Sequence, residues 1–260
     1  DEESYNIWKS IGIPEHKIAK MPKKNNWWIA SASGPCGPDT EMFYWSPSAD
    51  AQGKILEYPP ESSNPKTDED NWLEIWNDVF MQYYKKIDGT YETLKQKNVD
   101  TGMGLERTLV ALNGFKDVFE VDTFKPIIKK IEAIGAKRYE AGDSSPMARN
   151  DIRSGRIIAD HLRTATMIMG DDRGIAPSNV DQGYIVRRLI RRAIRHGRLL
   201  GITENFCAKI SEEVIKIFAD VYPEVERNKK FVLSEIEKEE NKFRKTLENG
   251  ISDFRFQISD

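Results

Sequence analysis

The sharpest chemical pattern in this 260-residue chain is the run Asp100-Thr101-Gly102-Met103-Gly104-Leu105-Glu106-Arg107. The run places a carboxylate at a strand end, two glycines that let a ligand approach the backbone, and an arginine in the first turn of a helix. These features suit a ligand that carries an amine and phosphates. Asp100 would pair with the ammonium group, and Arg107 would clamp a phosphate or lie across a purine ring. Gly-x-Gly turns also join strands to helices without any ligand, so a purely structural role stays open.

A second pattern is a pair of amides inside a strand that is otherwise built for burial. Asn77 and Gln82 lie in the run Ile75-Trp76-Asn77-Asp78-Val79-Phe80-Met81-Gln82. A buried amide needs a hydrogen-bond partner, which is either protein or a bound ligand. Because side chains alternate along a strand, Asn77 shares a face with Val79 and Gln82 lies on the other face, so at most one amide lines a given pocket.

A third pattern is an arginine-rich helix predicted over Tyr184 to Leu200. At about 100° per residue, six arginines fall into one sector, while apolar residues fill the opposite side. Phosphate is the natural partner of such a face, although a solvated face paired with acids elsewhere in the chain is the alternative. The six are Arg187, Arg188, Arg191, Arg192, Arg195 and Arg198.

Polar residues before and upstream of this helix suggest two further roles. Asn179 follows Pro177 and Ser178 at the helix entrance, where a short amide either caps the helix or reads the base edges of a polynucleotide that lies along the arginines. Asp160 and His161 occupy neighbouring helical positions with no nucleophile nearby in sequence, which favours a salt-linked network over a catalytic histidine.

Composition sets the class of protein. The chain has 39 basic and 42 acidic residues, a net charge of −3, and 39% hydrophobic residues, which predicts a folded protein rather than a basic nucleic-acid coat or a disordered tail. No apolar stretch is long enough to span a membrane and no secretory signal opens the chain, so we expect a cytoplasmic protein without a membrane partner. Two distant cysteines, Cys36 and Cys207, and three histidines show no metal-ligand spacing, so no structural metal site is predicted.

The elements that position these residues fall into two groups. Gly and Pro in Ser33 to Pro38 predict a bent loop between strands, and Glu74 to Lys85 reads as a strand covered on both faces. Asp88-Gly89 predicts a hairpin turn into a second strand, Thr90 to Leu94. A third strand is predicted to end at Val99-Asp100. The Pro-rich stretch Ser46 to Asp70 reads as an insertion. Helical periodicity dominates after Asp117. The fold class is therefore α+β, with predicted domains at 1–116 and 117–260.

Taken together, these motifs resemble the alanyl-tRNA synthetases in order and spacing over nearly the whole chain. The matching blocks are Trp28, Ser33 to Pro38 with Thr40-Glu41, Glu74 to Gln82, Val99 to Arg107, Ala159 to Arg163, Pro177 to Asn179, and Gly183 to Gly197. The resemblance implies a partial class II antiparallel sheet followed by an all-helical tRNA-recognition domain. It also implies joining of alanine to ATP, with Mg²⁺, to form alanyl-adenylate, and transfer of the alanyl group to tRNA(Ala).

The resemblance assigns a role to each matched residue. In the alanine pocket, Asp100 would hold the ammonium group, Asn77 the carboxylate end, Trp28 a wall, and Gly102 the space for a small side chain. Arg107 matches the arginine of class II motif 3 and would contact ATP beside Gly104. In the acceptor-stem site, Asn179 would lie at the G·U pair of the tRNA, and phosphates would run along Arg187, Arg188, Arg191, Arg192 and Arg195.

Departures from the family pattern define the alternatives. Motifs 1 and 2, with the arginine that grips the α-phosphate, are not in the chain, so we expect an interior fragment that binds acceptor-stem RNA but forms adenylate poorly alone, its partner being the N-terminal half of the core. Asp39 and Ser31-Ala32-Ser33 also differ from the family's loop. Two competing hypotheses are a non-catalytic RNA-binding module and a general nucleotide-binding protein that uses Gly102 to Arg107.

Overall fold

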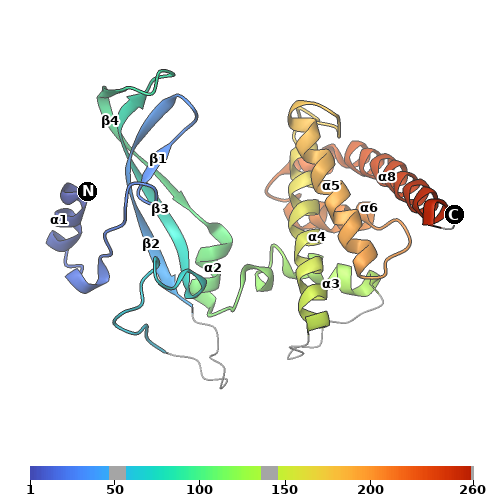
Figure 1. The fold of residues 1–260 in the computed structure, drawn as a ribbon, viewed down its shortest axis with the longest axis horizontal. Helices are drawn as coiled ribbons and strands as arrows, with labels where there is room; N and C mark the ends of the chain where they lie inside the picture. The colour runs from blue at the N-terminus through green and yellow to red at the C-terminus, as the bar shows by residue number, and fades with distance from the viewer. Residues whose placement is uncertain (47–56, 136–145, 259–260) are drawn as a thin grey trace. The chain divides into compact units, whose positions relative to one another are not determined.

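A computed structural model describes residues 1–46, 57–135 and 146–258 of the chain. The chain divides into two compact units, Asp1–Val118 and Phe119–Asp260. This division lies two residues after the predicted boundary at 116/117. The first unit holds a β-sheet and the second is helical where it is described, as Figure 1 shows. The fold class is therefore α+β, as predicted.

The sheet of the first unit has four antiparallel strands in the order β1-β2-β3-β4. Each strand pairs with its neighbour in sequence, so hairpin connections build the whole sheet. The unit opens with helix α1 (Glu2–Ser10), whose N-cap Asp1 accepts a hydrogen bond from the Ser4 backbone N–H. The strands are β1 (Trp27–Ile29), β2 (Gly34–Trp45), β3 (Trp72–Lys85) and β4 (Tyr91–Met103).

The predicted Gly/Pro loop is wrong, because Gly34 to Pro38 form the first part of β2. The chain turns earlier, between Ile29 and Gly34. Pro38 lies within a register shift between Cys36 and Asp39, where a residue that cannot donate to the ladder is tolerated, whereas Pro35 lies opposite Tyr84. Gly37 is needed there for a close approach: a Cβ at this position would lie 1.8 Å from the Phe80 carbonyl oxygen.

The hairpin at Asp88-Gly89 is confirmed, with Gly89 at φ 85°. The two strands predicted after it form one continuous strand, β4. The register shifts where Met81 and Tyr83 of β3 lie opposite Asn98 and Thr93, so the residues between Thr93 and Asn98 stay in the same strand. β3 is internal in the sheet, but its predicted coverage on both faces is wrong. Of its residues only Val79 is buried, and the others are partly exposed.

The strand-to-helix junction lies later than predicted, because β4 continues past Asp100 and includes Gly102 and Met103. Helix α2 (Leu105–Asn113) starts after Gly104 and ends at Gly114, which adopts φ 65°. This left-handed conformation favours glycine and closes the helix C-terminus. The Gly104 N–H donates to the Ile75 carbonyl oxygen at 3.0 Å, so the start of α2 is fixed to β3.

The described part of the second unit contains no strand. Helices account for the periodicity found after Asp117, as predicted. A separate short helix, α7, then precedes the long final one. The helices are α3 (Lys125–Ile134), α4 (Pro146–Gly170), α5 (Asp181–Leu199), α6 (Cys207–Phe218), α7 (Pro223–Arg227) and α8 (Lys229–Ile258).

The core of the helical unit forms around α4 and α5, which pack along each other (Figure 1). Their fully buried side chains include Ile158, Leu162, Ile190 and Ile194. Each such side chain stabilises the fold by about 1.5–3 kcal/mol relative to an exposed one. The apolar face predicted for α5 is thus confirmed, although Ile185 remains 49% exposed.

Among the described residues, no helix is both long enough and apolar enough to cross a membrane. Part of the predicted insertion, residues 47–56, lies outside the described residues. Its remainder ends in the short helix η2 (Glu69–Asn71), which leads into β3. Trp45 and Trp72 stack edge-on at 5.2 Å across the base of this excursion, so its two ends lie together.

Candidate functional site

The register of the sheet gathers several predicted site residues on one face. Asn77 pairs with Gly102, and Val79 pairs with Asp100. Cross-strand partners in an antiparallel ladder project to the same face, as do residues two apart in one strand. Asn77, Asp100 and Gly102 therefore share one face, which we call the acidic face.

A bulge in β3 adds a further carboxylate to this face. Between Met42 and Phe43 the register of β2 on β3 shifts by one residue, so that Phe43 pairs with Glu74. The extra β3 residue interrupts the alternation and brings Glu74 to the face of Asn77. Glu41, which pairs directly with Asn77, is close enough to Glu74 for repulsion between their carboxylates.

Arg107 reaches the same neighbourhood from the first turn of α2. Its guanidinium donates to the Glu74 carbonyl oxygen at 3.1 Å and to Glu74 Oε2 at 3.3 Å. Both side chains are partly exposed, 49% and 36%, and exposed pairs of this kind contribute only about 0–1 kcal/mol. The guanidinium can therefore exchange Glu74 for a phosphate at little cost.

Glu41 is a functional candidate to which the sequence analysis gave no role. Burial raises its pKa to about 7, and repulsion from Glu74 and Asp39 acts in the same direction, while a hydrogen bond from Asn77 opposes them. Burial likewise raises the pKa of Asp39, which is only 5% exposed. A carboxyl group that titrates near pH 7 can accept or donate a hydrogen bond at a substrate.

The two predicted glycines have different surroundings. A Cβ on Gly102 would meet no atom within 4 Å, so the chain leaves open space beside Asp100. A Cβ on Gly104 would lie 3.2–3.4 Å from three carbons of the Arg107 side chain. Gly104 therefore lets Arg107 fold back along the backbone towards Glu74.

The two neighbouring tryptophans of β1 behave differently. Trp27 stacks on Tyr83 at 5.7 Å and meets the edge of Tyr91 at 5.8 Å. Alternation along the strand sends Trp28 to the opposite face from this cluster. Trp28 is 37% exposed and pairs with Gly37. Its predicted role as a pocket wall stays a prediction.

In the helical unit, Asn179 lies exposed in the turn before α5. Ser178 holds this turn, since its Oγ donates to the Val180 carbonyl oxygen at 2.7 Å and accepts from the Val180 N–H at 3.2 Å. Gly183 permits the tight packing, because a Cβ there would lie 2.4 Å from Ser178 Oγ. No side chain caps α5, so the capping alternative for Asn179 is wrong and its amide is presented to solvent.

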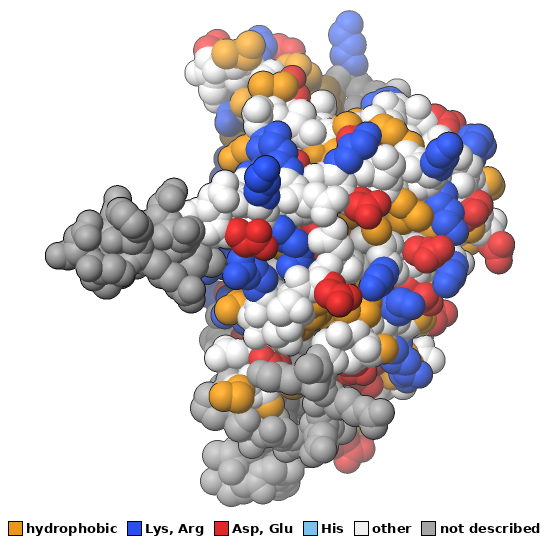
Figure 2. Space-filling view, turned by 90° about the vertical axis from the view of Figure 1, so that its right-hand side faces the viewer, with side chains coloured by type: hydrophobic (Ala, Val, Ile, Leu, Met, Phe, Trp, Pro, Cys, Tyr) orange, Lys and Arg blue, Asp and Glu red, His pale blue; other side chains and the backbone are white. Residues whose placement is uncertain are grey.

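The six arginines of α5 do not form one uniform face. Arg187 and Arg191 donate to Glu239 Oε1 of α8, at 3.2 and 2.5 Å, and Glu239 is only 8% exposed. These two guanidinium groups are thus already neutralised within the unit. The exposed arginines are Arg188, Arg192, Arg195 and Arg198. On the face drawn in Figure 2, cationic and anionic side chains are likewise interspersed.

The histidines of this region serve structure. His161 Nδ1 lies 2.8 Å from Asp160 Oδ2, so these two neighbouring side chains interact with each other. His196 Nδ1 lies 3.0 Å from Ser154 Oγ and joins α5 to α4. Burial lowers the pKa of His196, and the nearby charges of Arg192 and Arg195 lower it further, so this ring is neutral at pH 7.

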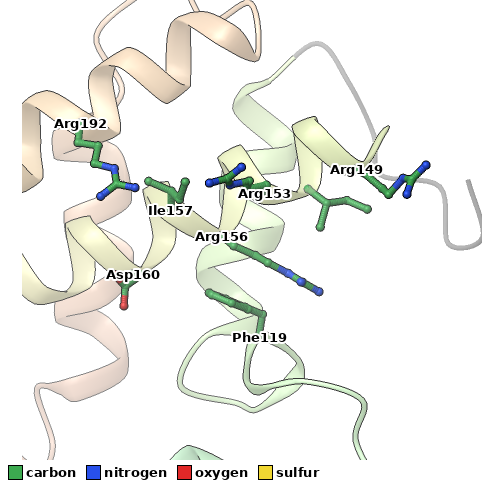
Figure 3. Close-up of a pocket in the computed structure, with 8 residues that line it drawn as sticks. Phe119, Arg149, Arg153, Arg156, Ile157, Asp160 and Arg192 are labelled. Atoms are coloured by element: carbon green, nitrogen blue, oxygen red, sulfur yellow. The ribbon is translucent and has the colours of Figure 1, made fainter. Parts of the chain in front are cut away.

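A pocket of about 570 Å³ lies between α4 and α5 (Figure 3). We call it the arginine pocket, and sequence reasoning missed it. The signal was present as basic residues at steps of four and three along α4, a spacing that places them on one face of a helix. Its lining residues are Phe119, Arg149, Ile152, Arg153, Arg156, Ile157, Asp160 and Arg192.

Whether the acidic face fits a metal can be judged from its donor set. Among the described residues, no group of three or more His, Cys, Asp or Glu side chains is arranged to hold an ion. Mg²⁺ in nucleotide sites takes many of its ligands from phosphates and water, with one or two carboxylates from protein. The residues present therefore offer no complete metal cage, and we derive no chemical step through a metal.

Comparison of the sequence with known proteins identifies a family and several relatives. The family model described as "tRNA synthetases class II (A)" matches residues 1–260. The alanine–tRNA ligase of Treponema pallidum (strain Nichols) is 41% identical over 261 residues, which cover 99% of this chain and 40% of that protein. The alanine–tRNA ligase of Treponema denticola is 46% identical over 237 residues, covering 90% of this chain and 37% of that protein.

A more distant relative shows the same partial coverage. The alanine–tRNA ligase of Idiomarina loihiensis is 39% identical over 254 residues, 97% of this chain and 27% of that protein. The chain thus spans well under half the length of each of these curated relatives.

Proposed function

Because the chain belongs to the class II tRNA synthetase family of type A, we propose that it is part of an alanine–tRNA ligase. It would supply motif 3, part of the alanine pocket and the helices that bind the tRNA acceptor stem. The observation that supports this most strongly is the register that sets Asn77 opposite Gly102, next to the pair of Val79 and Asp100. Relatives that are alanine–tRNA ligases support alanine as the substrate.

The acidic face suits the two ends of an amino acid. Asp100 is exposed on the edge strand β4 and offers a carboxylate to an ammonium group. Asn77 lies across the ladder from Gly102, so its amide can reach the carboxylate end. The open space at Gly102 admits a methyl group, whereas a side chain in its place would fill that space. This arrangement supports a small amino acid as the ligand.

Arg107 would bind ATP by exchanging its ion pair with Glu74 for a phosphate. ATP supplies the leaving pyrophosphate when the amino-acid carboxylate attacks its α-phosphorus. The protein's part in such a reaction is to position the reactants and to stabilise the developing charge. The described residues provide one guanidinium for this purpose, Arg107, and we expect weak or absent adenylate formation by the 260-residue chain alone.

In the helical unit, Asn179 would read the acceptor stem while arginines hold its backbone. The exposed amide at the entrance of α5 has the donor and acceptor that a base edge requires. Arg188, Arg192 and Arg195 would contact phosphates directly. Arg187 and Arg191 would contribute to RNA binding mainly by fixing α5 against α8 through Glu239.

A chimaeric enzyme tests the proposal. The matched segment of the Treponema pallidum alanine–tRNA ligase is replaced by this chain, and aminoacylation of tRNA(Ala) is measured. We expect activity with alanine, and a loss for tRNA whose acceptor-stem G·U pair is changed to G–C. The change Asn179→Ala should remove that discrimination. A well-folded chimaera that binds tRNA but never charges it would favour the non-catalytic RNA-binding module instead.

A further inference from the structure

The arginine pocket is lined by more cationic than anionic side chains. Four guanidinium groups line it, from Arg149, Arg153, Arg156 and Arg192, against the single carboxylate of Asp160. Asp160 contacts His161 at 2.8 Å, and this hydrogen bond, with the nearby charges of Arg163 and Arg192, lowers its pKa. The carboxylate is thus ionised at neutral pH.

The individual arginines differ in how they are held. Arg156 lies over the Phe119 ring, 5.3 Å from its centroid, so one wall of the pocket is fixed by stacking. Figure 3 shows Arg149, Arg153 and Arg192 following one another along the opposite side, from α4 and α5. All three are exposed, and the structure records no ion pair for them within the described residues. Like charges gathered in this way favour the binding of an anion.

The geometry favours a phosphate as that anion. Guanidinium groups match phosphate oxygens through paired, charge-assisted hydrogen bonds. The exposed arginines Arg188, Arg195 and Arg198 follow the length of α5, an arrangement suited to a continuous backbone of singly charged phosphodiesters. The pocket instead collects arginines of two helices around one concavity, which suits a terminal group. A terminal phosphate carries a charge of about −1.5 to −2 at pH 7, more than a diester does.

We propose that the arginine pocket binds the 5′-terminal phosphate of the acceptor-stem RNA. Arg192 belongs to both the pocket and the exposed arginines of α5, so the two sites are continuous. Along α5, Arg192 lies eleven residues beyond Asp181, or about 16 Å at 1.5 Å per residue, from the helix entrance beside Asn179. The inference rests on the proposed function, because it requires the same RNA on the same unit.

The test compares two acceptor-stem hairpins that differ only at the 5′ end, one phosphorylated and one with a hydroxyl group. Binding to the full 260-residue chain is measured by fluorescence anisotropy. We expect about tenfold tighter binding of the phosphorylated hairpin, the effect of one charge-assisted interaction. In the double variant Arg149→Gln/Arg153→Gln this preference should disappear, while the hydroxyl hairpin binds nearly as before.

The matched control is Arg173→Gln/Lys209→Gln, which removes two exposed charges of the same unit outside the pocket. It should have the same small effect on the affinity for both hairpins and so keep their ratio. Both altered pocket residues are exposed, so Gln should leave the thermal unfolding midpoint unchanged. Equal binding of the two hairpins by the unaltered chain, or a preference that survives Arg149→Gln/Arg153→Gln, overturns the inference.

Two further measurements distinguish the possible reasons for a negative result. If inorganic pyrophosphate binds in a pocket-dependent way while the hairpins bind equally, the site takes free phosphate and the RNA assignment is wrong. Asn179→Ala should remove the preference for a G·U hairpin over a G–C hairpin but keep the preference for the 5′-phosphate. A chain that binds no hairpin contradicts the proposed function, and the inference falls with it.

Discussion

Asn77 Nδ2 donates a hydrogen bond to Glu41 Oε1 at 3.1 Å. The side-chain amide oxygen of Asn77, Oδ1, is buried without a partner among the described residues. The amide is therefore oriented by the ionisation state of its neighbour. An ionised Glu41 can only accept and so holds the N–H group. A protonated Glu41 can donate to the carbonyl oxygen, and the amide can then turn its N–H group towards a substrate carboxylate.

This relationship predicts a pH-dependent affinity for alanine. As the pH rises through about 7, Glu41 ionises and retains the Asn77 N–H group, so alanine should bind more weakly. In the chimaeric enzyme, the KM for alanine should rise several-fold between pH 6 and 8, and Glu41→Gln should flatten this profile. A profile that is unchanged by Glu41→Gln would show that another group controls the affinity.

The same group predicts a pH-dependent stability. The pKa of Glu41 in the folded chain, about 7, lies above its ordinary value of 4.5, so the folded state binds the proton more tightly. Stability should therefore fall as the pH rises from about 4.5 to 7 and stay level above that. Because the side chain is partly exposed, we expect Glu41→Gln to gain only about 1–2 kcal/mol at pH 8 and nothing at pH 4. Urea unfolding at both pH values measures this difference.

Gly102→Ala and Gly104→Ala should separate the two substrates. A methyl group at Gly102 meets no protein atom and so should leave folding unchanged, but it occupies the space proposed for the alanine side chain. A methyl group at Gly104 presses on the Arg107 side chain. In the chimaeric enzyme we expect the first change to raise mainly the KM for alanine and the second mainly the KM for ATP. Steady-state kinetics that reverse this pattern would contradict the assignments.

Glu239→Gln tests the role of the half-buried arginines. Loss of the carboxylate leaves Arg187 and Arg191 without their shared partner, which should cost about 1–3 kcal/mol of stability. It also frees two positive charges, so hairpin affinity should increase at low salt. Glu235→Gln, on the same helix and paired with Lys238, is the control and should change neither quantity greatly. Unchanged affinity in Glu239→Gln would mean that α5 has moved or that RNA does not approach this side.

Glu240→Gln should be the most destabilising single change in this part of α8. The side chain is fully buried and accepts hydrogen bonds from the backbone N–H groups of Phe206 and Cys207, at the start of α6, and from Arg244. Losing the charge weakens all of these bonds, at a cost of about 2–4 kcal/mol. Thermal unfolding should show a large decrease in Tm, whereas the exposed neighbour Glu237→Gln should have little effect.

Local chemistry made part of this fold predictable. The hairpin at Asp88-Gly89 and the helix that carries Arg107 in its first turn follow from turn chemistry and periodicity, and both are confirmed. Prolines were misleading at Gly34 to Pro38, because Pro38 lies in a register shift and Pro35 lies opposite Tyr84 within the same strand. The bulge that turns Glu74 towards Asn77 has no signal in the sequence.

Long-range pairing limited the prediction of the site. The helical face of α5 was predicted, but its pairing with Glu239 involves a residue 52 positions from Arg187 and cannot be read from periodicity. The arginine pocket combines α4 with α5, so only the packing of the two helices reveals it. Glu41 stood in a recognised motif, yet its raised pKa depends on neighbours contributed by β3.

The central claim is that Asp100 acts on the substrate face that it shares with Asn77. The most direct measurement is alanine-dependent ATP–pyrophosphate exchange by the chimaeric enzyme carrying Asp100→Asn, beside Asp78→Asn, which alters the opposite face of the same strand pair. We expect Asp100→Asn to lower kcat/KM for alanine by about 10–100-fold, the effect of losing a charge-assisted contact, and Asp78→Asn to change it little. Equal effects of the two changes, or full activity in Asp100→Asn, would contradict the account.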